Sequence, residues 1–276
     1  MVTSCEPKIF LIGETKTIWK MDNTESPIDG GMGDYLEFIG ASDWGSYGHH
    51  RSSELLTEFY GRLCYRSWKP GMNPNVTKVR SGNQEYLNNI LKSGHNSVTE
   101  HAMTNWIFAD VSRVFTHELV RHRVGVAISQ ESLRYVRLDQ LKAWLPTVIQ
   151  EDDFGLAVFL DTFEKLEDLQ KHLAEHFELD KEGTPFAKKK AVTSAMRRIA
   201  PIGLATTIGW SCNFHMLRHV IEQRTSRHAE EEIRLVFGRV AHFAKDRWPN
   251  LFQDMREEVV NGLPEMTFGR FDKEEQ

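Results

Sequence analysis

The spacing of hydrophobic residues along the chain predicts a series of amphipathic helices. In residues 53–68, Leu55, Leu56, Phe59 and Leu63 fall on one face at helical spacing, and we expect that face to be buried. Several such stretches end at glycine or proline, as helices commonly do. The same reasoning predicts helices over residues 83–93, 112–123, 153–177, 184–199, 214–223 and 229–248.

Shorter stretches rich in apolar and β-branched residues predict strands. They cover residues 8–12, 102–110 and 202–212. Residues 21–50, by contrast, are rich in Gly, Ser and Asp and are predicted to form a long loop. Strands and long helices in one chain, without an internal repeat, predict an α+β fold, which we treat as a single domain over residues 1–276.

The composition is that of a globular protein with an acidic balance. Of the 276 residues, 40% are hydrophobic and 26% are charged, and the formal net charge is -5. A general nucleic-acid-binding protein is usually basic. We therefore expect no nucleic-acid partner and interpret the clusters of arginine as sites for small anionic ligands.

The sequence contains no predicted membrane span, secretion signal or disulfide framework. No apolar run is long enough to cross a bilayer, and the run after Lys8 stops before Glu14, too short for a signal peptide. The three cysteines, Cys5, Cys64 and Cys212, include no Cys-x-x-Cys pair. These features predict reduced thiols, a cytoplasmic location and no membrane partner.

Residues 121–135 carry the densest candidate chemistry. Arg121, His122 and Arg123 are consecutive at the predicted end of a helix, and an extended Ser-Gln-x-Ser-x-Arg segment follows. Arginine binds phosphate through two parallel charge-assisted hydrogen bonds, so three arginines within fourteen residues indicate phosphate-binding positions close in space. The alternative is a solvated basic helix end, whose cations offset the last carbonyl groups.

Two other kinds of site compete with a phosphate and cofactor site. His215 and His219 are four residues apart on a predicted helix, so both could face one metal ion, with His228 as a third ligand. No acid occupies the matching helical position, and we expect no metal, keeping a metal-dependent enzyme as a remote alternative. A hydrolase built on Ser132 is the other alternative, but the Gly-x-Ser-x-Gly nucleophile elbow is absent.

Motifs in several separate blocks of the chain occur together in one known family. After Arg-His-Arg, eight residues separate Arg123 from Ser132, which begins Ser-x-Arg. Upstream, residues 94–101 read Gly-His-x-Ser-x-x-Glu-His. The downstream blocks are Arg197 four residues before Pro201, Asn213, and Arg224-x-x-x-His228. Over about residues 55–250 the chain thereby resembles the flavin-dependent thymidylate synthase family, whose signature is Arg-His-Arg, seven residues, then Ser-x-Arg.

The resemblance implies a fold, a reaction and an assembly. Members have a twisted sheet flanked by long helices, the fold of the thymidylate-synthase-complementing proteins, and act as homotetramers with sites between subunits. They methylate C5 of the uracil of a nucleoside monophosphate, dUMP giving dTMP, with FAD, NADPH and methylene-tetrahydrofolate. The chain is therefore expected to be a methyltransferase of nucleotide biosynthesis whose cofactors carry the difficult chemistry.

The resemblance also implies which residues form the site. Arg224 is the implied catalytic residue, because a guanidinium at the uracil edge favours negative charge on the ring and makes C5 more nucleophilic. The implied substrate-binding residues are Glu118, Arg121, Gln130, Glu131, Ser132, Leu133, Arg134, Arg197 (from a neighbouring subunit) and Arg224. The implied cofactor-binding residues are His95, Ser97, Arg121, His122, Arg123, Gln130, Asn213, His215, His219 and His228.

The sequence departs from the family pattern at several points. The spacer is one residue longer, which reshapes the loop expected beside the nucleotide sugar. Glu118 stands where the family usually has Gln near the substrate, and His219 where an Asn usually contacts the flavin. The chain also carries extra length around residues 21–50 and 150–185. These changes leave two substrates open, dUMP and UMP, the latter as in nucleoside-antibiotic biosynthesis.

Overall fold

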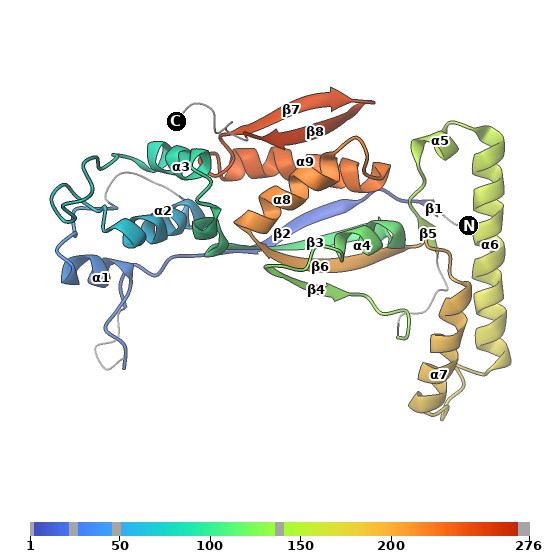
Figure 1. The fold of residues 1–276 in the computed structure, drawn as a ribbon. Coiled ribbons are helices and arrows are strands. Elements are labelled where there is room, and N and C mark those ends of the chain that lie inside the picture. The colour runs from blue at the N-terminus through green and yellow to red at the C-terminus, as the bar shows by residue number, and fades with distance from the viewer. Residues whose placement is uncertain (1–2, 22–26, 46–50, 136–140, 270–276) are drawn as a thin grey trace.

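A four-stranded antiparallel sheet forms the centre of the computed structural model, which describes residues 3–21, 27–45, 51–135 and 141–269. The strands lie in the order β2-β3-β6-β4, and each neighbouring pair is antiparallel (Figure 1). Their bounds are β2 Lys8–Glu14, β3 Met103–Ser112, β6 Ala205–Asn213 and β4 Val126–Gln130. The sheet and its helices confirm the expected mixture of helix and strand.

The main core lies between this sheet and two long helices, α8 (Phe214–Thr225) and α9 (Glu231–Arg247), which cover one face (Figure 1). Alternate side chains of a strand point to the same face. Trp106 of β3 accordingly pairs in register with Trp210 of β6, and both are buried. Their partners in this core include Phe115, Leu217, Val220, Ile233 and Phe237.

A β-hairpin that the sequence analysis did not predict packs on the other side of α8 and α9 (Figure 1). Its strands are β7 (Met255–Val260) and β8 (Leu263–Phe268). Asn261 and Gly262 connect them with φ angles of 55° and 76°. Two positive φ angles are typical of a type I′ turn, for which Asn-Gly is a strong sequence signal, so the hairpin could have been found from the sequence.

An arm of three helices extends at one end of the molecule (Figure 1). Its helices are α5 (Thr147–Gln150), α6 (Asp153–His176) and α7 (Phe186–Met196). Phe154 at the start of α6 is 79% exposed and Phe186 at the start of α7 is 68% exposed. The apolar side chains predicted to form a buried stripe on α6 are therefore only partly covered within one chain, since Phe159 and Phe177 are also exposed.

The opposite end contains α1 (Met32–Phe38), α2 (Ser52–Tyr65) and α3 (Asn83–Lys92). Helix α1 corrects the prediction that residues 21–50 form a loop throughout. It forms because Leu36, together with Trp44, joins a second small core with Phe59 and Trp68. The Gly-rich composition therefore concealed a short helix that tertiary packing stabilises.

The buried face of α2 differs from the predicted one. Phe59 is buried as expected, but Leu63 is 38% exposed. Glu58 and Arg62 are buried instead, with Arg62 Nε donating to Glu58 Oε1 at 2.7 Å. The Arg62 guanidinium also lies 4.4 Å from the centre of the Tyr86 ring. The prediction failed because apolar periodicity does not count charged residues as buried, even when two of them pair within the same helix as Glu58 and Arg62 do.

The remaining elements are short. Strand β1 (Thr3–Ser4) pairs in parallel with β5 (Lys142–Ala143). Helix α4 (Arg113–Leu119) follows β3, and two 3-10 turns cover Asn96–Glu100 and Arg197–Ile199. Within the described ranges, none of the helices combines the length and the apolar character that a bilayer crossing requires.

Candidate functional site

Arg224 is held by three hydrogen bonds from the last turn of α8 to the end of α4. Its Nε donates to His122 Nε2 at 2.8 Å, its Nη1 to Glu118 Oε2 at 2.7 Å and its Nη2 to the Glu118 carbonyl at 2.9 Å. The Arg224 and Glu118 side chains are 19% and 29% exposed, so a ligand can reach the pair. Helix α8 continues to Thr225, two residues past the predicted end at 223, so Arg224 lies on the helix.

His122 is neutral in this arrangement. Burial, with the Arg224 guanidinium and His219 nearby, lowers the pKa of His122 from 6.5 to about 4. A neutral imidazole has one acceptor nitrogen, and accepting from Arg224 assigns that role to Nε2. The proton therefore lies on Nδ1, which is free to donate.

Helix α4, which carries Glu118, is fixed at its first turn. Ser112 caps it, because the Ser112 Oγ accepts the Phe115 N–H at 3.1 Å. The Glu232 carboxylate accepts from both the N–H and the Oγ of Ser112, and burial raises the pKa of Glu232 to about 7. The helix ends at Leu119, so the basic triplet lies in the turn after the helix and not inside it as predicted.

Gly125 turns the chain from the basic triplet into β4. Its φ is +65°, and a Cβ at this position would lie 2.4 Å from Asn213 Nδ2. Asn213 donates its N–H to the Gly125 carbonyl at 3.1 Å and caps α8 by accepting the Met216 N–H at 2.8 Å. Asn213 thus has a capping role that tightly couples the turn to the start of α8.

The two arginines of the triplet are available for a ligand. Arg121 and Arg123 are exposed, and neither has an ion-pair partner in the part of the chain that the structure describes. They flank the half-buried His122. Unpaired guanidiniums on either side of a neutral imidazole form a donor set suited to phosphate oxygens.

A cavity of about 240 Å³ adjoins this triplet. Its polar lining consists of Asn96, His215, Arg218, His219, Glu222 and Asp254. Arg218 is committed to Asp254 through hydrogen bonds of 2.8 and 2.7 Å. His215, His219 and Asn96 remain as polar groups that can donate to a ligand, and the His219 ring lies 5.6 Å from the ring of His122.

The segment predicted to bind flavin upstream lies at this cavity too. His95 precedes the 3-10 turn Asn96–Glu100, which packs on α8, and Asn96 lines the cavity. His95 and Ser97 are exposed, and the His95 ring stacks on Tyr65 with centroids 6.2 Å apart. The fold therefore brings residues 95–97 close to α8.

A second cluster lies at the start of α4 and contains an arginine that the sequence analysis missed. Arg113 Nη2 donates to the Glu131 carbonyl at 3.2 Å, while its Nε is buried without a hydrogen-bond partner within the described chain. Burial lowers the pKa of Arg113, and Arg197 lowers it further. A cation in the first turn of a helix opposes the helix dipole. This unfavourable position is the sequence feature that could have identified Arg113 as a candidate ligand-binding residue.

The residues after β4 form a short polar loop beside Arg113. Gln130 ends the strand with its Nε2 donating to Thr116 Oγ1 at 3.0 Å. The Glu131 carboxylate accepts the Thr207 N–H at 3.0 Å. The Ser132 Oγ accepts the Arg134 N–H at 3.4 Å, and the exposed Arg134 side chain lies over the ring of Tyr135.

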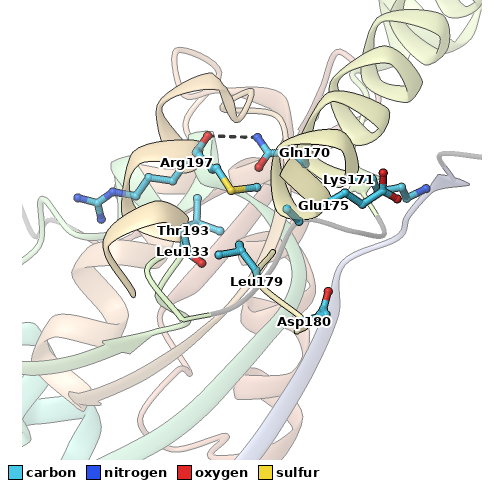
Figure 2. Close-up of a pocket in the computed structure, with 10 residues that line it drawn as sticks. Leu133, Gln170, Lys171, Glu175, Leu179, Asp180, Thr193 and Arg197 are labelled. Carbon is cyan, nitrogen blue, oxygen red and sulfur yellow. Dashed lines mark hydrogen bonds between the residues drawn. The ribbon is translucent and has the colours of Figure 1, made fainter. Parts of the chain in front are cut away.

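Leu133 and Arg197 meet at a cavity of about 150 Å³ between this loop and the arm (Figure 2). Gln170 of α6, which lines it, donates to the Met196 carbonyl at 3.1 Å. Figure 2 shows that the Arg197 guanidinium extends away from the other labelled side chains. The cavity therefore receives the stem of Arg197, and its charge points outward.

The alternatives to a phosphate and cofactor site gain no support. In the described ranges, no group of three or more His, Cys, Asp or Glu side chains could hold a metal ion. His228 is exposed beyond α8, with its N–H 3.4 Å from Ser226 Oγ, and it does not join His215 and His219. Ser132 has no histidine partner among the described contacts, which leaves a hydrolase without its base.

Comparison with known proteins shows a family to which the sequence of this chain is similar. Residues 48–250 match the family model described as "Thymidylate synthase complementing protein" (Thy1). A protein of Corynebacterium efficiens named flavin-dependent thymidylate synthase is 33% identical over 220 residues, which cover 79% of this chain and 84% of that protein.

Two further relatives carry the same name. The protein of Corynebacterium diphtheriae is 32% identical over 222 residues, covering 79% of this chain and 85% of the relative. The protein of Mycolicibacterium gilvum is 36% identical over 182 residues, covering 65% of this chain and 70% of the relative. The matched region includes the basic triplet, Arg224 and Arg113, and it ends before Asp254 of the cavity lining.

Proposed function

The chain belongs to the family of thymidylate synthase complementing proteins, and on that premise we propose that it methylates C5 of the uracil of dUMP, using FAD, NADPH and methylene-tetrahydrofolate. The observation that carries the proposal is the hydrogen bond of 2.8 Å between Arg224 and His122, residues 102 positions apart. It joins the arginine proposed for the substrate to the triplet proposed for the flavin. UMP is the second candidate substrate, because the eight-residue segment 124–131 lengthens the loop proposed beside the sugar.

A flavin dinucleotide would bind at the basic triplet and extend to the 240 Å³ cavity, which His215 and His219 line. Arg121 and Arg123 would bind its diphosphate, and His95, Ser97, Gln130, Asn213, His215, His219 and His228 would contact the remainder. His122 would donate from Nδ1 while its Nε2 stays with Arg224. When bound, FAD would accept a hydride from NADPH and pass reducing equivalents to the folate methylene group.

Arg224 would act on the pyrimidine ring. A guanidinium has five N–H groups, and three of those of Arg224 are used by His122 and Glu118. One N–H remains on each terminal nitrogen for a ring carbonyl. Donors fixed before the reaction stabilise negative charge as it develops on that oxygen, which makes C5 a better nucleophile.

The second cluster would bind the nucleotide phosphate. Arg113 brings a buried Nε that has no hydrogen-bond partner among the described residues, and Ser132, Leu133 and Arg134 would add a hydroxyl, an apolar contact and a second guanidinium. Arg197, whose guanidinium points away from its own cavity (Figure 2), would reach the phosphate of a neighbouring subunit. Several guanidiniums around one phosphate offset its charge more completely than one can.

We expect the protein to be a homotetramer, with the arm in a subunit interface. Four phenylalanines of the arm, Phe154, Phe159, Phe177 and Phe186, are exposed within one chain, and their burial between chains would favour association. Phe154→Glu should lower the sedimentation coefficient, whereas Phe38→Glu, at a residue 85% exposed at the other end of the chain, should not. A fully active wild-type monomer would contradict the proposal.

The reaction is tested by a turnover assay on the purified protein. It should convert dUMP, or UMP run beside it, to the 5-methyl product only when methylene-tetrahydrofolate and NADPH are both present. Activity on both nucleotides would indicate that the longer segment 124–131 has opened the site at the sugar. If neither nucleotide is methylated while the protein binds and reduces flavin, the proposed reaction is wrong.

The flavin provides the control for this assay. The purified wild type should be yellow, and Arg121→Ala should give a folded, colourless protein, because an exposed guanidinium contributes to ligand binding and little to stability. Absorbance and circular dichroism measure the two properties separately. A wild type that fails to bind added FAD would exclude the flavin-dependent reaction.

A further inference from the structure

A cavity of about 290 Å³ adjoins His95 and has no role in the function proposed above. Ile90 and His95 line this cavity, whereas the next residue after each, Leu91 and Asn96, lines the 240 Å³ cavity. The same short piece of chain, from the end of α3 to the 3-10 turn, therefore borders both cavities.

Three rings contribute to the wall of this second cavity. Tyr65 comes from the end of α2, Tyr86 from α3, and His95 from the segment after α3. Tyr86 is buried, and the Tyr65 and His95 rings are inclined by 24° with centroids 6.2 Å apart. Because aromatic rings associate through their faces and edges, a wall of this kind favours a flat aryl group.

The charged side chains of the lining are both cations. Lys78 and Arg80 come from the segment 66–82 that joins α2 to α3, and none of the described residues that line the cavity is an acid. The carboxylate of Glu85 lies outside the lining, 4.0 Å from Lys78 Nζ and 3.9 Å from Arg80 Nε, and its side chain is 51% exposed. Such long, exposed contacts contribute little energy, so both cations can turn to a ligand.

We propose that this cavity binds the aminobenzoyl-glutamate end of the folate cosubstrate, with the glutamate carboxylates at Lys78 and Arg80. The proposal rests on the proposed function, which requires the folate methylene group to reach a flavin beside Asn96. A folate ends in an aryl amide that carries one or more glutamates. An aryl group followed by carboxylates matches the rings and the cations of a cavity whose wall includes His95, the neighbour of Asn96.

The test measures binding of the tail alone, without pteridine and without turnover. Calorimetry at low ionic strength compares aminobenzoyl-glutamate with aminobenzoyl-triglutamate. The wild type should bind the triglutamate tighter by about fivefold or more, the scale expected of two partly exposed ion pairs. The double variant Lys78→Gln with Arg80→Gln should bind the two compounds within about twofold of each other, because it lacks both cations.

This double variant is expected to keep its fold. Arg62 donates from Nη2 to the backbone carbonyl of Arg80 at 2.7 Å, and that bond does not depend on the Arg80 side chain. The Lys78 side chain is 73% exposed. Circular dichroism verifies that the variant is folded.

Two single variants show whether local charge is the cause. Glu85→Gln removes the acid that competes for Lys78 and Arg80, so it should bind the triglutamate more tightly than the wild type does. Lys165→Gln removes an exposed cation that pairs with Asp161 on α6, and it should leave binding unchanged.

The outcomes separate this proposal from the proposed reaction. Equal binding of the two compounds by the wild type, or an undiminished preference in the double variant, overturns the proposal even if the protein methylates a nucleotide. Displacement of the triglutamate by adenosine 2′,5′-bisphosphate would assign the cavity to NADPH and would overturn the proposal too. If the tail binds as expected but neither dUMP nor UMP is methylated, the proposed reaction fails while the tail site stands.

Discussion

Replacing Arg224 by alanine should lower turnover by about a hundredfold or more, the scale of effect seen when one preorganised donor to a developing charge is removed. The alanine variant loses both N–H groups that remain free for the ring, together with the contacts to His122 and Glu118. Steady-state kinetics on the nucleotide that the wild type uses measures the change. The loss should fall mainly on kcat, because the interaction strengthens as charge develops.

Arg224→Lys is the informative companion variant. A lysine ammonium is a point charge without the planar fork, so it cannot bond His122, Glu118 and a ring carbonyl together, and it should rescue turnover poorly. If Arg224 were only a cation at the end of α8, its replacement would cost about 0.3–1 kcal/mol of stability and leave kcat unchanged. That result would remove Arg224 from the proposed mechanism.

Replacing Glu58 by alanine should lower the free energy of unfolding by about 3–5 kcal/mol, because it leaves the buried Arg62 cation without its counter-charge. Arg62 is 2% exposed and donates to Glu58, to the Ser67 carbonyl at 2.5 Å and to the Arg80 carbonyl at 2.7 Å. Two carbonyls cannot neutralise its charge. Chemical denaturation of wild type and variant, followed by circular dichroism, measures the difference.

A double replacement shows whether charge is the cause. In Glu58→Met with Arg62→Met both charges are gone and much of the buried volume is kept, so the double variant should be more stable than Glu58→Ala. As a matched control, Asp161→Ala breaks an exposed ion pair with Lys165 and should change stability by less than about 1 kcal/mol. A loss below about 1 kcal/mol in Glu58→Ala would show that the Arg62 charge is compensated by other groups.

Much of the fold was predictable because local patterns report local structure. Strand β3 alternates buried and half-buried side chains through Trp106 and Phe108, as a strand with one face on a core must. Helix α3 buries Tyr86, Leu87, Ile90 and Leu91, and its limits agree with the predicted 83–93 within one residue. The Asn261-Gly262 turn was equally local, and its hairpin was missed only because the signal was not used.

For the candidate site, the sequence predicted the family but not all of the residues that lie together. Sequence blocks in the right order indicated the family, and the comparisons confirm that membership. The roles assigned to individual residues stay predictions. Arg113 was not predicted as a site residue because it belongs to none of the sequence blocks that resemble the family. Only the structure shows that its Nε is buried without a hydrogen-bond partner among the described residues, close to Glu131 and Arg197.

The sequence by itself determined the order of the long helices, the order of β2, β3 and β6, and the family, because periodicity, caps and motif spacing are properties of neighbouring residues. Only the tertiary structure decided which charges meet. Arg224 reaches Glu118 across 106 positions, and Arg62 is buried with Glu58 on a helix face that lacks an apolar stripe. A charged side chain can be buried only where a partner compensates it. The partner of Arg224 comes from a distant part of the chain. Glu58 also accepts a hydrogen bond from Asn83, which lies on a different helix, and neither contact leaves a local pattern in the sequence.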